Sequence, residues 1–243
     1  MAHAYLVAEL ADTAAGELIT VGGDEARHAV KVARLQVGEQ IELLNGHGMR
    51  VVCETVAVSP STFEVRVLEV VREPEPTPRI HLVQALAKGG RDEMAVQAAV
   101  ELGVSSVTPW QAHRSVSQWR GEKVARQRDR WTSICREAAK QSLSAWLPAV
   151  EDFAASVPQL MQRLSAAQVI VLDPRAETRL SEVDCVADDI VLVVGPEGGI
   201  ESREFDEFTQ LGAQRVRLGA EVLRTSTAGP AAIAVLQCKL GRW

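Results

Sequence analysis

The chain has 243 residues, 47% of them hydrophobic, and its 26 basic and 32 acidic side chains give a formal net charge of −6. This composition is typical of a globular protein and excludes disorder, a collagen-like repeat and a disulfide scaffold. The four cysteines stand far apart without zinc-type spacing, so we expect no structural metal and a reducing, cytoplasmic compartment. The longest apolar runs are too short to span a bilayer. Taken alone, the acidic balance argues against a nucleic-acid partner.

The first 72 residues are dominated by short runs typical of β-strands. The turn Asn45-Gly46-His47-Gly48 is a strong hairpin signal, and a short helix is expected over residues 25–33 with Asp24 as its N-cap. This density of short strands predicts a small β-barrel domain over residues 1–72. The predicted strands cover residues 39–44, 49–58 and 62–71.

A proline-rich segment follows this first domain. Pro74, Pro76 and Pro78 alternate with other residues, which prevents both a helix and a central strand. Residues 73–78 are therefore predicted to form an extended, fairly stiff linker between two domains.

From residue 79 onward, predicted strands alternate with predicted helices. The pattern indicates an α/β domain over residues 79–243 with a largely parallel sheet. Its strands are expected at residues 80–86, 106–110, 168–173, 190–194 and 215–218, and its helices at 92–102, 122–144, 203–211 and 231–240.

One segment reverses the acidic balance of the chain. Residues 111–149 hold eight basic and three acidic side chains, a net charge of +5, and four of the five tryptophans lie in or beside them. Basic residues interleaved with aromatic ones suit phosphate contacts and base stacking. The alternative is an amphipathic helix with a solvated basic face, in which Trp131 belongs to the core. We favour the core for Trp131 and leave Trp119 open.

Three loops are expected at the carboxyl ends of parallel strands, where ligands bind in open α/β sheets. They cover residues 172–174, 195–199 and 218–227. The middle loop, Gly195-Pro196-Glu197-Gly198-Gly199, lets the backbone approach a ligand closely. It matches neither a Walker loop nor the dinucleotide-binding fingerprint, so ATP and NAD are disfavoured.

These loops carry a family resemblance. The glycine-rich segment with Glu204, followed by Leu218-Gly219-x-x-Val222-Leu223-Arg224-Thr225-x-Thr227-Ala228, resembles the SPOUT methyltransferases that methylate N3 of a uridine in 16S ribosomal RNA. The segments at residues 27–34 and 100–104 fit the same family. The chain departs from the family's pattern at Lys140, Ser144 and Ser226, so roles of the family's residues there do not transfer.

The resemblance implies a PUA-like barrel followed by a SPOUT domain with a C-terminal trefoil knot, acting as a homodimer. It also implies the cofactor S-adenosylmethionine, held bent among the three loops. The cofactor-binding residues would be Leu172, Gly195, Pro196, Glu197, Gly198, Gly199, Leu218, Gly219, Val222, Leu223, Thr225 and Thr227.

For methyl transfer to uracil N3, the proton on N3 must be removed and the negative charge that develops on the two carbonyl oxygens must be stabilised. Glu197 would accept the proton or orient the base, and Arg224 would stabilise the oxyanion. The alternatives are that Glu197 caps its loop and that Arg224 pairs with a carboxylate of the dimer mate. Attack at nitrogen needs no thiolate, so the cysteines are expected to be structural. The candidate RNA contacts are Arg27, Lys31, Arg34, Lys88, Arg91, Arg114 and Arg120.

The predicted function is therefore S-adenosylmethionine-dependent methylation of 16S ribosomal RNA, with the free RNA or the small ribosomal subunit as substrate. Two alternatives remain: a SPOUT methyltransferase acting on another ribosomal or transfer RNA position, and an RNA-binding assembly factor without catalysis. The departures at Lys140 and Ser226 support the second alternative. Since the net charge is acidic, we expect RNA binding to depend on a correctly placed basic patch.

Overall fold

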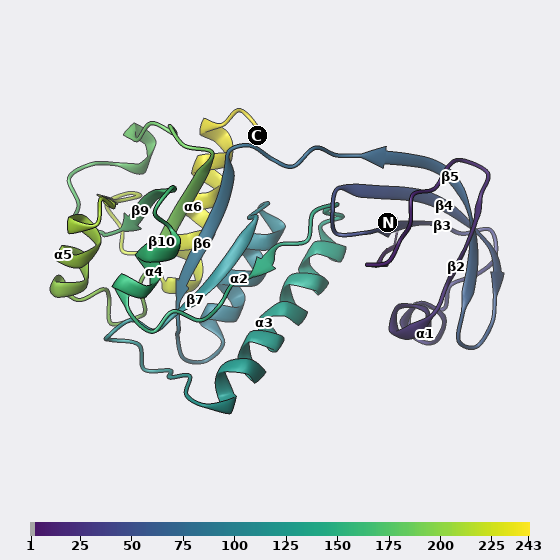
Figure 1. The fold of residues 1–243 in the computed structure, drawn as a ribbon, viewed down its shortest axis with the longest axis horizontal. Helices are drawn as coiled ribbons and strands as arrows, with labels where there is room; N and C mark the ends of the chain where they lie inside the picture. Colours follow the sequence, from purple (N-terminus) through teal and green to yellow (C-terminus); the bar gives the residue numbers. More distant parts are fainter. Residues whose placement is uncertain (1–2) are drawn as a thin grey trace. The chain divides into compact units, whose positions relative to one another are not determined.

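A computed structural model describes residues 3–243 (Figure 1). The chain divides into two compact units. The first comprises Met1–Glu75 and Ala139–Leu147, and the second comprises Pro76–Ala138 and Pro148–Trp243. Among the described residues, no helix combines the length and the apolar character needed to cross a membrane.

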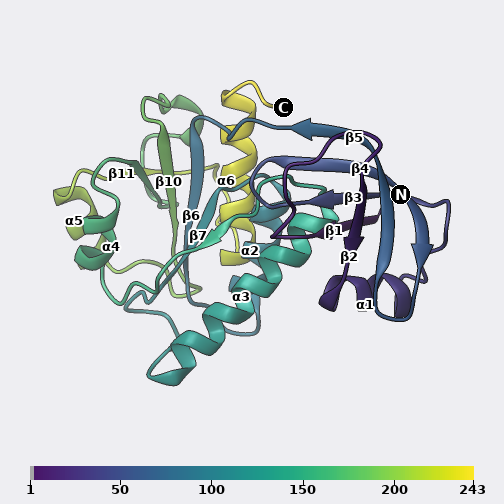
Figure 2. The ribbon, with the colours of Figure 1, turned by 45° about the vertical axis from the view of Figure 1, so that its right-hand side comes forward.

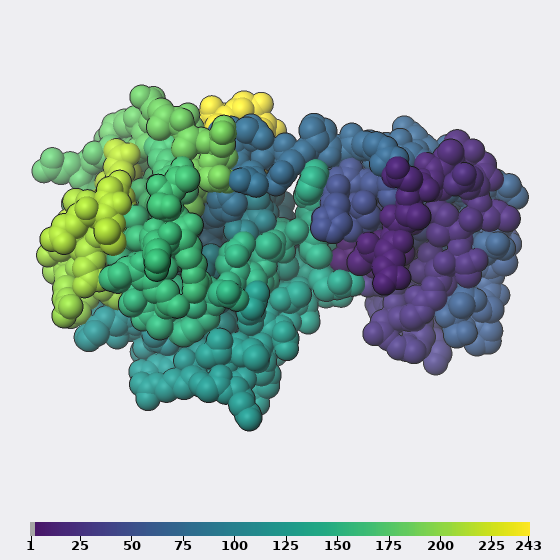
Figure 3. Space-filling view, viewed as in Figure 1, coloured from purple at the N-terminus to yellow at the C-terminus, as the bar shows by residue number. Residues whose placement is uncertain are grey.

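The first unit is built on a five-stranded sheet with the strand order β1-β3-β4-β5-β2. Strands β1 and β3 are parallel, and the other neighbours are antiparallel. The space-filling view shows the purple and blue residues of this unit packed as one body (Figure 3). The elements are β1 (His3–Leu6), β2 (Leu18–Val21), α1 (Gly23–Lys31), β3 (Gln40–Leu44), β4 (Met49–Val58) and β5 (Phe63–Arg72).

Alternation along the strands creates the core of this unit. Every second side chain of β4 from Met49 to Thr55 is buried, as a half-buried strand requires. On β5, Phe63 lies beside Tyr5 with 5.5 Å between the ring centroids. Helix α1 contributes Ala26 and Ala29, both fully buried. The predicted β-rich first region is therefore confirmed, although β1 and β2 had no clear signal in the sequence.

The segment 139–147 belongs to this first unit, although we expected it in the second domain. Trp146 pairs with His47 in an isolated antiparallel bridge, and its Nε1 atom donates to the carbonyl oxygen of Glu73 at 3.1 Å. Gly48, at φ +87°, gives Trp146 room, because a Cβ atom there would lie 2.6 Å from the indole ring. Lys140 pairs with Glu25 at 3.3 Å.

The second unit contains a six-stranded, fully parallel sheet in the order β11-β9-β10-β6-β7-β8. The strands are β6 (Arg79–Ala85), β7 (Ser106–Trp110), β8 (Ala149–Val150), β9 (Gln168–Leu172), β10 (Asp189–Val194) and β11 (Gln214–Val216). The helices are α2 (Arg91–Glu101), α3 (Glu122–Gln141, whose last turn lies in the first unit), α4 (Val157–Arg163), η1 (Leu180–Glu182), α5 (Ser202–Gln210) and α6 (Thr225–Lys239).

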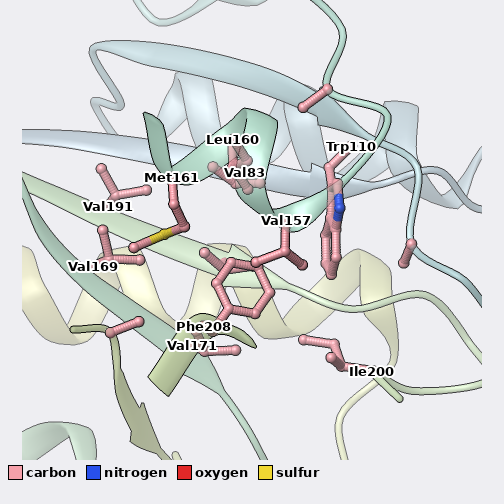
Figure 4. Packing of buried hydrophobic residues seen from close by; sticks show 14 of the residues in the cluster. Val83, Trp110, Val157, Leu160, Met161, Val169, Val171, Val191, Ile200 and Phe208 are labelled. Carbon is pink, nitrogen blue, oxygen red and sulfur yellow. The ribbon is translucent and has the colours of Figure 1, made fainter. Parts of the chain in front are cut away.

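Helices cover both faces of this sheet (Figure 2). On one face, Leu160 and Met161 of α4 and Phe208 of α5 pack with strand valines such as Val171 and Val191 (Figure 4). On the other face, α6 approaches so closely that a Cβ atom on Gly229 would lie 3.1 Å from a Leu82 methyl group. The near-continuous apolar strands predicted such two-sided burial, and the α/β class is confirmed.

Several features of the second unit differ from the expectations, and strand β8 and helix η1 had no prediction. Helix α6 begins at Thr225, six residues before the expected start, because Pro230 is accommodated within the helix. Helix α4 had no prediction; Ser156 caps it, accepting a hydrogen bond from the Gln159 amide. Helix α3 ends at Gln141, three residues earlier than expected.

Candidate active site

A cavity of about 660 Å³ opens where β9, β10 and β11 end. Its walls are the three loops expected there: residues 172–175 after β9, 195–200 after β10, and 217–225 leading from β11 into α6. Carboxyl ends of parallel strands meet at one edge of a sheet, so distant parts of the sequence converge at this point. The size lies within the range of small-molecule sites.

The loop after β10 is shaped by glycine. A Cβ atom on Gly195 would lie 2.7 Å from Cγ1 of Ile200, which closes the loop behind it. Gly198 packs on Arg114, since a Cβ atom there would lie 3.1 Å from the Cβ atom of Arg114. Gly199 has φ +73°, and its amide donates to the carbonyl oxygen of Pro196 at 2.9 Å. A Cβ atom at Gly195 or Gly198 would force a neighbour to shift, and the positive φ of Gly199 disfavours any other residue there.

Glu197 joins this glycine-rich loop to the loop after β6. Its Oε1 atom accepts hydrogen bonds from the Lys88 amide at 3.1 Å and from Nη1 of Arg91 at 3.0 Å. Burial acts to raise the pKa of Glu197, but hydrogen bonds from its own amide, Lys88 and Arg91, with the charge of Arg91, lower the pKa below its usual value. The carboxylate is therefore ionised at neutral pH and is a weak proton acceptor.

Arg224 and Thr225 form the third wall, where α6 begins. Arg224 is the N-cap residue; its side chain is exposed and has no ion-pair partner among residues 3–243. Thr225 is buried, and its hydroxyl donates to the carbonyl oxygen of Gly195 at 2.7 Å. A flexible cation and a fixed hydroxyl therefore stand side by side at the cavity.

Asp173 is a lining residue that the sequence analysis did not select. Its side chain is 1% exposed, although it lies at the end of β9 in the cavity wall. Nε of Arg215 donates to its Oδ2 atom at 3.1 Å, and the Arg175 amide donates to Oδ1 at 3.0 Å. Burial acts to raise the pKa of Asp173, but the two arginines lower it overall. No sequence motif indicated this pair, because Asp173 directly follows β9 and Arg215 lies 42 residues away on the neighbouring strand β11.

The structure brings all but one of the predicted cofactor residues to the cavity. Thr227 is the exception: it does not line the cavity, is exposed on α6, and donates its amide to the carbonyl oxygen of Arg224. The predicted residues that line the cavity are Leu172, Gly195, Pro196, Glu197, Gly198, Gly199, Leu218, Gly219, Val222, Leu223, Arg224 and Thr225.

The predicted RNA contacts fall into separate groups. Arg91 and Arg114 line the cavity, where Arg91 holds Glu197 and Nη1 of Arg114 donates to the Gly198 carbonyl oxygen at 3.2 Å. Lys88 holds Glu197 through its amide, and its side chain is exposed. Arg120 is exposed just before α3. The remaining three, Arg27, Lys31 and Arg34, are exposed on or just after α1 in the first unit.

Two tryptophans of the basic segment, Trp119 and Trp131, are core residues. Trp131 is 0% exposed, which confirms its predicted place in the core, and Trp119 is 4% exposed. The two rings meet edge to face with centroids 5.3 Å apart, and Trp119 also stacks on Phe153. Arg130 on α3 pairs with Glu93 instead of standing free. The aromatic residues therefore build the fold here and do not present a stacking platform for bases.

Two of the four cysteines are buried and poorly suited to act as nucleophiles. Cys53 and Cys135 are buried, and burial raises the pKa of each thiol to about 12. Across residues 3–243, no group of three or more His, Cys, Asp or Glu side chains is arranged to hold a metal ion.

Comparison with known proteins identifies the family. The model of the RNA methyltransferase domain matches residues 73–237, and that of the RNA methyltransferase PUA domain matches residues 21–68. A Mycobacterium bovis protein named ribosomal RNA small subunit methyltransferase E is 38% identical, over all of this chain and 94% of its own length. The chain belongs to the ribosomal RNA small subunit methyltransferase E family.

Two further members show how far the similarity extends. The Bacillus subtilis protein of the same name is 31% identical over 86% of this chain and 85% of its own. A crystal structure of the Neisseria gonorrhoeae family member, bound to S-adenosylmethionine, has 26% identity and a TM-score of 0.88, covering 98% of each chain. Family membership confirms the predicted SPOUT methyltransferase class, the PUA-like first domain and the enzymatic class of RNA methyltransferase.

Proposed function

We propose that this enzyme transfers the methyl group of S-adenosylmethionine to N3 of a uridine in 16S ribosomal RNA. The observation that carries the proposal is the cavity at the ends of β9, β10 and β11, which brings together the motif residues of a family that includes a cofactor-bound member. Ribosomal RNA also explains a PUA domain on the same chain.

The cavity residues fit this cofactor. Leu172, Val222 and Leu223 supply apolar surface for a nucleoside ring, while the backbone of the glycine-rich loop supplies N–H and C=O groups for its polar edges. The loop accepts a ligand close to its main chain, because Gly198 and Gly199 have no side chains. When bound, S-adenosylmethionine supplies an electrophilic methyl group.

The chain's own residues then hold the acceptor base and handle its charge. We assign Arg224 to the uracil carbonyl oxygens, where negative charge develops as N3 gives up its proton to solvent water and becomes nucleophilic. Its free guanidinium at the cavity supports this role. We assign Glu197 to orientation of the base through its Oε2 atom, since Oε1 is occupied and the lowered pKa makes it a poor proton acceptor.

Further parts of the proposal concern the whole enzyme. Residues 1–72 would position RNA through Arg27, Lys31 and Arg34, and residues 79–243 would carry the reaction, with residues 73–78 as linker. Lys88, Arg91, Arg114 and Arg120 would contact RNA nearer the cavity. The enzyme would act as a homodimer in the cytoplasm, with a trefoil knot formed by the C-terminal part of the chain.

Two measurements test the proposal. Calorimetry with S-adenosylmethionine should show saturable binding by the purified protein. Purified 16S RNA and small subunits from a strain lacking the gene, incubated with protein and cofactor, should gain N3-methyluridine by nucleoside mass spectrometry. No heat of binding would refute the cofactor assignment, and a methylated product other than N3-methyluridine would refute the position.

A further inference from the structure

Gln84, on β6 behind the cavity, is a polar side chain that is 0% exposed. Its Nε2 atom lies 2.9 Å from Oγ1 of Thr225 and 3.1 Å from the carbonyl oxygen of Ala85. Thr225 Oγ1 lies 2.7 Å from the carbonyl oxygen of Gly195. One chain of hydrogen bonds therefore runs from the middle of the sheet, through the start of α6, to the glycine-rich loop.

The carbonyl oxygen of Gly195, at the end of this series of hydrogen bonds, determines which group donates in each of them. A carbonyl oxygen can only accept, so the Thr225 hydroxyl must donate its single proton to Gly195. Oγ1 of Thr225 then offers only lone pairs to Gln84, and Gln84 must turn its NH2 group toward it. The opposite amide orientation would place two acceptors against each other or remove the bond to Gly195.

With its NH2 group turned toward Thr225, Gln84 leaves its amide oxygen without a partner within residues 3–243. Oε1 of Gln84 is buried and has no hydrogen-bond partner among the described residues. An unpaired buried acceptor costs free energy, which a nonpolar side chain of similar size would avoid. The donor function of Gln84 at Thr225 offsets this cost.

We propose that Gln84 is a positioning residue of the cofactor pocket, which fixes the Thr225 hydroxyl on Gly195 and thereby locks two of the three loops together. The proposal rests on the proposed function. Two other side chains tie the glycine-rich loop, Arg91 to Glu197 and Arg114 to Gly198, and water reaches both of them. The Gln84 link is buried, so water does not compete with it.

A double-mutant cycle tests this link. Gln84→Met keeps the length but removes the donor, and Thr225→Val keeps the shape but removes the hydroxyl. We expect each to raise the Kd for S-adenosylmethionine by about three- to tenfold, and the double variant to bind no worse than Thr225→Val alone. Thr225→Ser, which retains the hydroxyl, should stay within about threefold of the wild type. Gln84→Met should keep its Tm, because it also removes the unpaired acceptor.

A matched control separates positioning from general packing. Gln237 is another buried amide, which donates to the carbonyl oxygen of Leu102 at 2.6 Å, away from the cavity. Gln237→Met should leave the Kd unchanged. Hydrogen exchange of the amides in residues 195–199, measured without cofactor, should become faster in Gln84→Met and not in Gln237→Met.

The outcomes distinguish the two proposals. Wild-type protein that does not bind S-adenosylmethionine refutes the cofactor assignment, and the exchange experiment then still decides the role of Gln84. Wild-type binding with unchanged Kd in Gln84→Met and Thr225→Val refutes the positioning role. So do additive losses in the double variant, or equal exchange in the two glutamine variants.

Discussion

The Nη1 atom of Arg91 lies 3.0 Å from the Oε1 atom of Glu197, and the Lys88 amide nitrogen lies 3.1 Å from the same oxygen. One carboxylate oxygen thus fastens the glycine-rich loop to the loop that follows β6. Because these donors lower the pKa of Glu197, the geometry favours a carboxylate that holds and orients over one that removes a proton.

Glu197→Gln tests whether the carboxylate holds the loop or removes a proton. The amide oxygen can still accept from Lys88, but the charge pairing with Arg91 is lost, so we expect turnover to fall by no more than about tenfold. In the wild type, the pKa of Glu197 lies below the ordinary glutamate value of about 4.3, so the carboxylate stays ionised between pH 5 and 8. Glu197 should therefore add no ionisation step to the pH–rate profile in this range. Single-turnover rates across this range check both points. Glu93→Gln, which breaks the Arg130 pair, is the control. A loss of about a thousandfold at unchanged cofactor affinity would instead identify Glu197 as the general base.

Arg224→Ala should lower kcat far more than cofactor affinity. If its guanidinium stabilises charge on the uracil oxygens, its loss should cost about 10²–10³ in kcat, with the Kd for S-adenosylmethionine changed by less than about threefold. Arg203→Ala, an exposed change on α5, should leave both quantities unchanged. Unaltered kcat in Arg224→Ala would remove this residue from the catalytic mechanism.

Asp173 should contribute stability that depends on pH. Its pKa is lowered in the folded protein, so its contribution is present above the unfolded value of about 3.9 and is lost as pH falls through the folded pKa. Asp173→Asn should therefore destabilise the protein at pH 7, by about 1–3 kcal/mol, and progressively less as the pH falls below about 4. Thermal unfolding at several pH values measures the difference. Asp152→Asn, at an exposed pair with Arg128, should cost less than about 0.5 kcal/mol at either pH. A pH-independent loss in Asp173→Asn would contradict the ion-pair explanation.

The exposed cations of the first unit should contribute to RNA affinity and not to cofactor binding. Lys31→Ala and Arg34→Ala should each reduce the salt slope of 16S RNA binding by about one, if each contacts a phosphate. Arg66→Ala, an exposed site on β5, serves as the control. Random RNA should bind weakly with a shallow slope, because the chain carries a net charge of −6. A steep slope with random RNA would show that general charge attraction dominates.

The sequence predicted the features that hydrophobic periodicity or a short motif encodes. Five of the six parallel strands of the second unit were predicted, because runs such as residues 190–194 are apolar without interruption; the two-residue strand β8 was not. The cavity was predicted because three loops had to meet at one sheet edge. Glu197 and Arg224 were found through a motif. Each of these signals lies within a few consecutive residues.

Contacts between residues far apart in the sequence could not be predicted in this way. Gln84 and Thr225 are 141 residues apart, and Asp173 meets Arg215 only because β9 and β11 are neighbours. The sequence leaves Trp119 open between the core and base stacking, because composition does not reveal what its ring contacts. Thr227 was placed in the cavity by the family resemblance; helix α6 starts at Thr225, and its third residue does not line the cavity.

The nine residues 139–147 have a consequence for biosynthesis. The first unit consists of residues up to Glu75 and of this segment, which supplies Trp146 to the indole contacts at Gly48 and Glu73. Chains emerge from the ribosome in order, and domains generally fold as units. The barrel therefore cannot complete its packing when residue 75 emerges; it must wait for about 70 further residues, including β6, β7 and all of α3. A fragment ending at the linker would leave the indole site beside Gly48 open, whereas one that also supplies the segment would close it.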